Sequence, residues 1–139
     1  CGAILGVNVT ICSPKGFETD PEIVEKAKSL SEFGSKISIC NSPTKAVKNA
    51  QVIYTDVWAS MGQEEEYLNR KEIFEKYRVD KELVALADEQ VILLHCLPAH
   101  RGEEIADEAL ESKNSCVFDQ AENRLHIQQA LLAAQLGGL

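Results

Sequence analysis

Length and charge limit what this protein can be. The chain has 139 residues, which is enough for one domain with a substantial core and too few for two domains of ordinary size. Its 22 Asp and Glu residues outnumber its 14 Lys and Arg residues, and the net charge of −8 argues against nucleic acid or an anionic membrane as the partner.

Strands and helices alternate along the chain. In chain order, the predicted elements are strand Val7–Cys12, helix Pro21–Phe33, strand Lys36–Cys40, helix Pro43–Lys48, strand Val52–Thr55, helix Glu64–Lys76, a short helix after Asp80, strand Val91–Leu94, helix Ile105–Leu110, strand Cys116–Phe118 and helix Ala121–Leu136. Parallel strands need return connections of helix length. The order therefore predicts an α/β fold, a doubly wound, Rossmann-like parallel sheet with helices on both faces.

Capping residues predict several helix ends. Asp20-Pro21 and Ser42-Pro43 each place proline at the first helical position after a capping side chain, and Gly34 ends the first helix. Residues 1–6 are typical of the last turn or two of a helix that Gly6 ends, with no strand before it.

The sequence shows no membrane, secretion or disulfide signal. No apolar stretch approaches the roughly 20 residues that span a bilayer, and the first residues lack the layout of a signal peptide, so we expect a soluble cytoplasmic protein. The cysteines are odd in number, scattered and without a Cys-x-x-Cys pair, which predicts reduced thiols rather than disulfides or a zinc site. They are Cys1, Cys12, Cys40, Cys96 and Cys116.

Two polar loops follow predicted strands. Residues 56–66 come directly after Val52–Thr55, and the run from His95 to Glu104 comes directly after Val91–Leu94. Loops at the carboxyl ends of parallel strands meet at one edge of the sheet, where α/β proteins keep their chemistry. The pattern predicts one shared site.

These loops, together with Glu122-Asn123-Arg124-Leu125-His126, closely resemble the ornithine-binding half of ornithine carbamoyltransferases. The resemblance extends to residues 13–18 and 20–24, and so covers nearly the whole chain. It implies that residues 1–139 form an ornithine-binding domain. The implied reaction transfers the carbamoyl group of carbamoyl phosphate to L-ornithine, gives citrulline and phosphate, and uses no cofactor.

Some family features do not occur in this sequence. The Ser-Thr-Arg-Thr and His-Pro-x-Gln segments of the family's carbamoyl-phosphate domain are absent, as is the Gly-Asp-Gly-Asn-Asn loop of the first strand of its ornithine domain. The resemblance therefore implies an ornithine-binding domain incomplete at its N-terminus, without its first strand and without the carbamoyl-phosphate domain. We expect the parent enzyme to be a homotrimer and the isolated chain to be nearly inactive.

Asp56 and the loop after it have two interpretations. Taken alone, Asp56 is typical of a turn or cap, and Ser60-Met61-Gly62 is typical of an ordinary loop. The resemblance implies instead that Asp56 binds the α-amino group of ornithine. It also implies that Ser60 and Met61 close over the amino acid.

Cys96 has three interpretations. It could be a nucleophile activated by His95 or His100, or a simple buried thiol. The resemblance implies a third role, in which Cys96 lies beside the ornithine side chain and, with Asp56, orients the δ-amino group without a covalent intermediate. The backbone carbonyl of Leu97 would then hold the carbamoyl NH2, with its backbone fixed by the following proline.

Arg124 lies near the predicted start of the final helix, where the helix dipole is positive and a cation is unfavourable unless an anionic or polarised ligand is near. A surface salt bridge with Glu122 or Asp119 is the alternative. The resemblance implies that Arg124 polarises the carbamoyl group as charge develops on its oxygen.

The histidines give no metal signal. His95, His100 and His126 lack the paired spacing of a zinc site, so the sequence predicts no metal. Two other functions compete with the transferase: a non-catalytic amino-acid-binding or interaction module derived from a carbamoyltransferase, and a cysteine hydrolase that uses Cys96.

Overall fold

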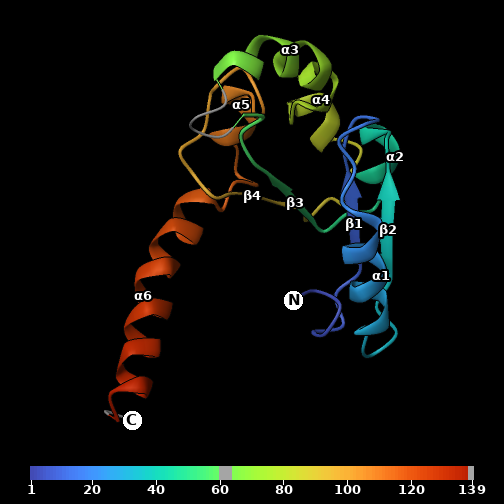
Figure 1. Cartoon of the computed structure of the whole chain (residues 1–139). Helices are drawn as coiled ribbons and strands as arrows, with labels where there is room; N and C mark the ends of the chain where they lie inside the picture. Colours follow the sequence, from blue (N-terminus) through green and yellow to red (C-terminus); the bar gives the residue numbers. More distant parts are fainter. Residues whose placement is uncertain (60–63, 138–139) are drawn as a thin grey trace. The chain divides into compact units, whose positions relative to one another are not determined.

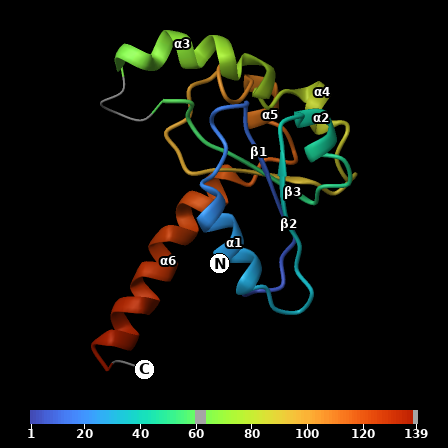
Figure 2. The ribbon, with the colours of Figure 1, turned by 45° about the vertical axis from the view of Figure 1, so that its right-hand side comes forward.

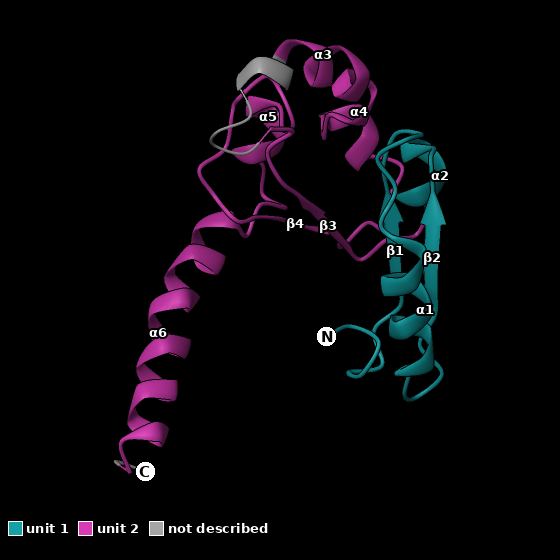
Figure 3. Ribbon diagram, viewed as in Figure 1, with its two compact units in different colours: residues 1–48 teal, residues 49–139 magenta. Residues whose placement is uncertain are grey.

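The protein folds into two compact units (Figure 3). In the computed structural model, which describes residues 1–59 and 64–137, residues 1–48 form the first unit and residues 49–139 the second. Each unit is built on one pair of parallel strands, with helices in the connections (Figure 1). The α/β class and the parallel pairing predicted from the sequence are confirmed.

The first unit pairs β1 (Val9–Cys12) with β2 (Ile37–Cys40). The connection between them contains α1 (Pro21–Ser29), and α2 (Pro43–Ala46) follows β2. The side chain of Val24 in α1 is buried, as are Ala3 and Val47, and these apolar groups form the small core of the unit. Cys12 lies opposite Cys40 in the strand register, and burial followed by the charge of Cys40 raises the pKa of the Cys12 thiol to about 11.

The helix ends in this unit follow their capping residues in part. Asp20 Oδ1 accepts the amide N–H of Glu22 at 2.8 Å, which confirms the predicted cap. α1 ends at Ser29 rather than at Phe33, because Phe33 and Gly34 both adopt positive φ angles, 55° and 75°, that a helix does not allow. Residues 1–6 form turns in which Gly6 has a φ of 76°.

The second unit pairs β3 (Val52–Thr55) with β4 (Ile92–His95), in parallel register. The connection between them holds α3 (Glu64–Phe74), the 3-10 helix η1 (Glu75–Tyr77) and α4 (Lys81–Val84). After β4 come the short α5 (Asp107–Leu110) and the long α6 (Val117–Gln135). Leu93, Ile105 and Val117 are almost fully buried and form the centre of this unit's core.

The predicted strand Cys116–Phe118 is wrong. A single parallel bridge joins Ser115 to Leu93, in which Leu93 N–H donates to the carbonyl of Asn114 at 2.8 Å and Cys116 N–H donates to the carbonyl of Leu93 at 2.9 Å. α6 then begins at once, at Val117. The helix therefore starts four residues before its predicted start at Ala121.

The α6 helix starts beside β4 and then extends away from the other elements of its unit (Figures 1 and 2). Its later turns expose large apolar side chains, among them Leu125, Leu131 and Leu132, each more than half exposed. Despite this apolar character, no described helix combines the length and hydropathy needed to cross a bilayer.

Candidate functional site

The two polar loops meet at the carboxyl edge of the β3–β4 pair. Thr55 lies opposite His95 in the register, so the next residues of the two strands, Asp56 and Cys96, emerge side by side. The thiol of Cys96 donates a hydrogen bond to Asp56 Oδ1 at 2.9 Å, and the same oxygen accepts the N–H of Val57 at 2.7 Å. The predicted meeting of the two loops is confirmed.

His95 is buried and fixes the backbone of the loop that follows. Its Nδ1 accepts the amide N–H of Leu97 at 2.8 Å, so the remaining ring proton is on Nε2. That nitrogen lies 3.0 Å from Glu104 Oε1. Both ring nitrogens of His95 are therefore used for structure.

Glu104 is a member of this site that the sequence did not reveal. Its side chain is completely buried, and its Oε1 also accepts the amide N–H of His100 at 2.6 Å. The carboxylate thus joins the end of β4 to the far end of the loop. The two adjacent glutamates before Ile105 were the only sequence signal, and they do not distinguish a buried carboxylate from an exposed one.

Leu97 has the backbone conformation of a tightly constrained loop. Its φ is 54°, in the left-handed region that non-glycine residues rarely adopt, and the Leu97–Pro98 peptide bond is cis. The bond from Leu97 N–H to His95 Nδ1 helps to hold this conformation. Its effect is to turn the loop sharply at the end of the strand.

Cys96, Leu97 and Arg124 line one open hollow of about 660 Å³. The other lining residues come from the same loop and the same helix: Pro98, Ala99, Ala121, Leu125 and Gln128. Arg124 is exposed, and within the described part of the chain it makes no ion pair, so the alternative interpretation, a surface salt bridge with Glu122 or Asp119, is not found there. Its guanidinium is available to a ligand in the hollow.

Arg124 does not lie at the positive end of the α6 dipole, so this prediction is wrong. Because α6 begins at Val117, Arg124 lies in the third turn of the helix rather than at its positive end. The first turn instead supplies Gln120, whose Oε1 accepts the N–H of His95 at 3.0 Å and whose Nε2 donates to the hydroxyl of Tyr54 at 3.2 Å. Gln120 thereby fastens α6 to both strands and sets the position of Arg124.

The remaining predicted site residues, Ser60 and Met61, lie outside the described residues, as does Gly62. Trp58, two residues before Ser60, is buried and packs against Phe74 with ring centroids 6.3 Å apart. This packing anchors the beginning of the loop.

The electrostatics of Cys96 oppose a role as a nucleophile. Desolvation of the sulfur, and then the hydrogen bond to Asp56 and its negative charge, raise the pKa of the thiol above its ordinary value. His95 Nδ1 is 4.0 Å from the sulfur but already accepts the N–H of Leu97. A cysteine hydrolase needs the opposite arrangement, a lowered thiol pKa and a free base.

We expect iodoacetamide to alkylate Cys96 more slowly at pH 8 in the folded chain than in the urea-unfolded chain, because the raised pKa leaves less thiolate. Asp56→Asn removes a negative charge beside the sulfur, so the pH midpoint of alkylation should move downward. Mass spectrometry of the Cys96 peptide against pH measures both effects. Faster labelling of Cys96 in the native chain than in the unfolded chain would contradict the assigned electrostatics.

Comparison with known families identifies the domain type. Residues 1–135 match the family model described as aspartate/ornithine carbamoyltransferase, Asp/Orn binding domain. The chain belongs to this carbamoyltransferase family. The match covers both loops and Arg124, and the relatives share the α/β architecture described above.

Named relatives agree with this assignment. The chain is 66% identical over its whole length to an ornithine carbamoyltransferase of Prochlorococcus marinus, covering 44% of that protein. The ornithine carbamoyltransferase structure from Pyrococcus furiosus superposes with a TM-score of 0.91 at 49% identity, covering 99% of this chain and 44% of that one. An anabolic enzyme from Campylobacter jejuni gives a TM-score of 0.88 at 38% identity, covering 99% of this chain and 46% of that one.

These relatives confirm the Rossmann-like fold class predicted from the sequence. The chain spans less than half the length of the carbamoyltransferases it matches.

Proposed function

We propose that this chain is the ornithine-binding domain of an ornithine carbamoyltransferase that acts in arginine biosynthesis. The observation that carries the proposal is the pair formed by Cys96 and Asp56, 2.9 Å apart, beside a hollow that Leu97 and Arg124 also line. A carboxylate with a neighbouring thiol suits an amine substrate. A guanidinium across the same hollow suits a group on which negative charge develops.

Each predicted residue has a role in this proposal. Asp56 pairs with an ammonium group of L-ornithine, and Cys96 orients the δ-amino nitrogen. Cys96 and Arg124 also face carbamoyl phosphate, whose carbamoyl NH2 is held by the carbonyl of Leu97. Ser60 and Met61 are proposed to close over the amino acid.

The chemistry is positioning combined with electrostatic stabilisation. The uncharged δ-amino nitrogen attacks the carbonyl carbon of carbamoyl phosphate. A C–N bond forms, the C–O bond to phosphate breaks, and the nitrogen loses a proton. Arg124 stabilises the negative charge that develops on the carbonyl oxygen, so no cofactor is needed for the products citrulline and phosphate.

Carbamoyl phosphate needs more binding groups than this chain supplies. The family's phosphate-binding segments do not occur among the 139 residues, so we assign phosphate binding to groups outside them. The 139 residues alone should therefore be nearly inactive. We propose that the complete enzyme is a cytoplasmic homotrimer.

The second candidate is a non-catalytic amino-acid-binding or interaction module. The guanidinium of Arg124, which has no ion-pair partner among the described residues, favours the transferase, since a module that only holds ornithine has no need of a cation in the same hollow.

Titration of the chain with L-ornithine, followed by amide NMR, tests the proposal. We expect saturable shifts centred on Asp56 and Cys96, and a loss of affinity of about tenfold or more in Asp56→Asn, because a charge-assisted hydrogen bond is worth about 1.5–3 kcal/mol. Asp88→Asn is the matched control, since Asp88 caps the turn before β4 through the N–H of Gln90. L-Aspartate and N-acetyl-L-ornithine should bind more weakly.

Two outcomes would count against the proposal. Stronger binding of L-aspartate than of L-ornithine would assign the domain to the other substrate of its family. If L-ornithine caused the same amide chemical-shift changes in Asp56→Asn as in the unsubstituted chain, Asp56 would not be part of the binding site.

A further inference from the structure

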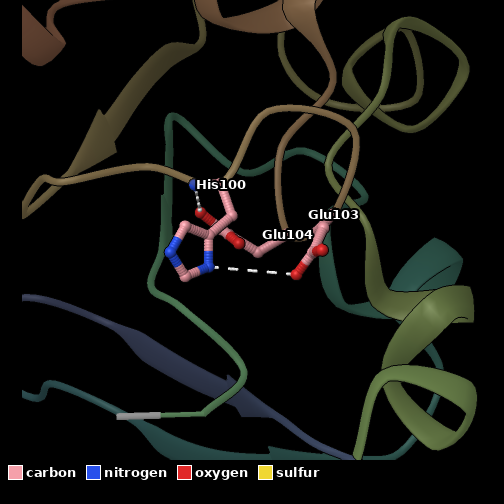
Figure 4. A group of neighbouring side chains, drawn as sticks. All are labelled: His100, Glu103 and Glu104. Atoms are coloured by element: carbon pink, nitrogen blue, oxygen red, sulfur yellow. Dashed lines mark hydrogen bonds and ion pairs between the residues drawn. The ribbon is translucent and has the colours of Figure 1, made fainter. Parts of the chain in front are cut away.

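Three potential metal ligands gather in the loop between β4 and α5. His100, Glu103 and Glu104 place one imidazole nitrogen and two carboxylate oxygens within 4.8 Å of one another (Figure 4). His100 Nδ1 lies 3.8 Å from Glu103 Oε2. The histidine spacing does not indicate this cluster, because the cluster uses one histidine and two carboxylates rather than paired histidines.

The buried carboxylate of Glu104 points to a ligand. Glu104 is completely buried, and both of its described hydrogen bonds are made by Oε1, with His95 and with the amide of His100. Its Oε2 is buried and has no partner among the described residues. Figure 4 shows this second oxygen directed into the space between the His100 ring and Glu103.

The charge of Glu104 is also uncompensated by its hydrogen-bond donors. His95 is neutral in the tautomer set by Leu97, and the second donor is a backbone amide. A buried carboxylate without a cationic partner is unfavourable. A metal ion at Oε2 would supply the missing positive charge.

We propose that His100, Glu103 and Glu104 bind one divalent cation of the Mn2+ or Zn2+ class. Imidazole nitrogen suits Zn2+ and neighbouring transition metals, whereas carboxylate oxygens suit Mn2+, and a mixed set of this kind accepts both. Water completes the coordination. Ca2+ is disfavoured because it takes six to eight oxygen ligands and avoids nitrogen.

The cluster can reach coordination geometry by small side-chain movements. Ligand atoms at about 2.0–2.2 Å from a metal ion lie about 3.5 Å apart, so these donors must draw together by about 1 Å. The side chain of His100 is 50% exposed and that of Glu103 is 16% exposed, which leaves His100 free to rotate toward the buried oxygen. Lys71 Nζ, 2.9 Å from Glu103 Oε1, is a competing cation.

Mn2+ titration followed by electron paramagnetic resonance tests the site directly. The folded chain should remove the free Mn2+ signal with a stoichiometry of one ion per chain, and added Zn2+ should release the Mn2+. His100→Ala and Glu103→Gln should each raise the dissociation constant at least tenfold. Lys71→Met should lower it several-fold, because the competing ammonium is gone.

The control variant is Glu108→Gln, an exposed carboxylate in α5 that lies outside the cluster. It should change the Mn2+ dissociation constant less than twofold. Saturable binding that His100→Ala and Glu103→Gln leave unchanged would overturn the proposal, as would the absence of saturable binding by the folded chain. Because the readout needs neither ornithine nor turnover, its failure is separate from a failure of the proposed transferase function.

Discussion

Asp56→Asn should lower citrulline formation about a hundredfold or more in a chimeric enzyme in which this chain replaces the matching residues of the Prochlorococcus marinus ornithine carbamoyltransferase. Asparagine keeps an oxygen that can accept hydrogen bonds from the thiol of Cys96 and from the N–H of Val57, so the loop geometry is retained. What is lost is the negative charge beside the substrate amine. The change therefore acts on the chemistry rather than on the fold.

Steady-state assays of the chimera at saturating carbamoyl phosphate, with L-ornithine varied, measure the effect as kcat/KM. The chimera without a substitution should be active, and Asp88→Asn should retain its activity. Equal losses in Asp56→Asn and Asp88→Asn would show that the first substitution only perturbs the strand ends. Full activity in Asp56→Asn would show that the reaction does not need the Asp56 carboxylate.

The part of the site that lies on the strands could be predicted from sequence because strand registers are local and regular. Val52–Thr55 was predicted at its observed bounds, and β4 within one residue. Parallel pairing then makes the next residues of the two strands neighbours. The meeting of Asp56 and Cys96 follows from that geometry alone.

The predictions failed where tertiary contacts override local preference. Val117 is completely buried in the unit's core, and its apolar run with Cys116 and Phe118 resembles a strand, yet the pairing with Leu93 ends at Ser115. The helix that follows moves Arg124 from the first turn to the third. Arg124 lines the same hollow as Cys96, and the role that the family resemblance implies for it stays a prediction, because the resemblance does not depend on where the helix begins.

The supporting contacts around the site could not be predicted at all. Gln120 and Glu104 contact His95 from 25 and 9 residues away, across segments whose paths the sequence does not define. Their residue types are ordinary for a helix and a loop. Only the folded backbone shows that a glutamine amide bridges two strands and that one of two adjacent glutamates is buried.

Glu104→Ala should destabilise the second unit by about 2–6 kcal/mol, because each of two buried donors left without an acceptor costs about 1–3 kcal/mol. The substitution deprives two buried groups of their acceptor, Nε2–H of His95 and the amide N–H of His100, and it leaves a cavity between them. Glu104→Gln keeps an oxygen at the same place. Glu104→Gln should lower the free energy of unfolding by only about 1 kcal/mol, since the amide oxygen is a weaker acceptor than a carboxylate.

Urea unfolding followed by circular dichroism, with EDTA present to exclude metal effects, measures the difference. Glu108→Ala is the exposed control from the same region and should shift the free energy of unfolding by less than about 0.5 kcal/mol. Amide NMR gives a second readout, because Glu104 orients His95 and His95 in turn holds Leu97 N–H. In Glu104→Ala the Leu97 amide should lose its protection from hydrogen exchange. If Glu104→Ala instead kept that protection and were as stable as Glu108→Ala, the buried carboxylate would not hold this loop.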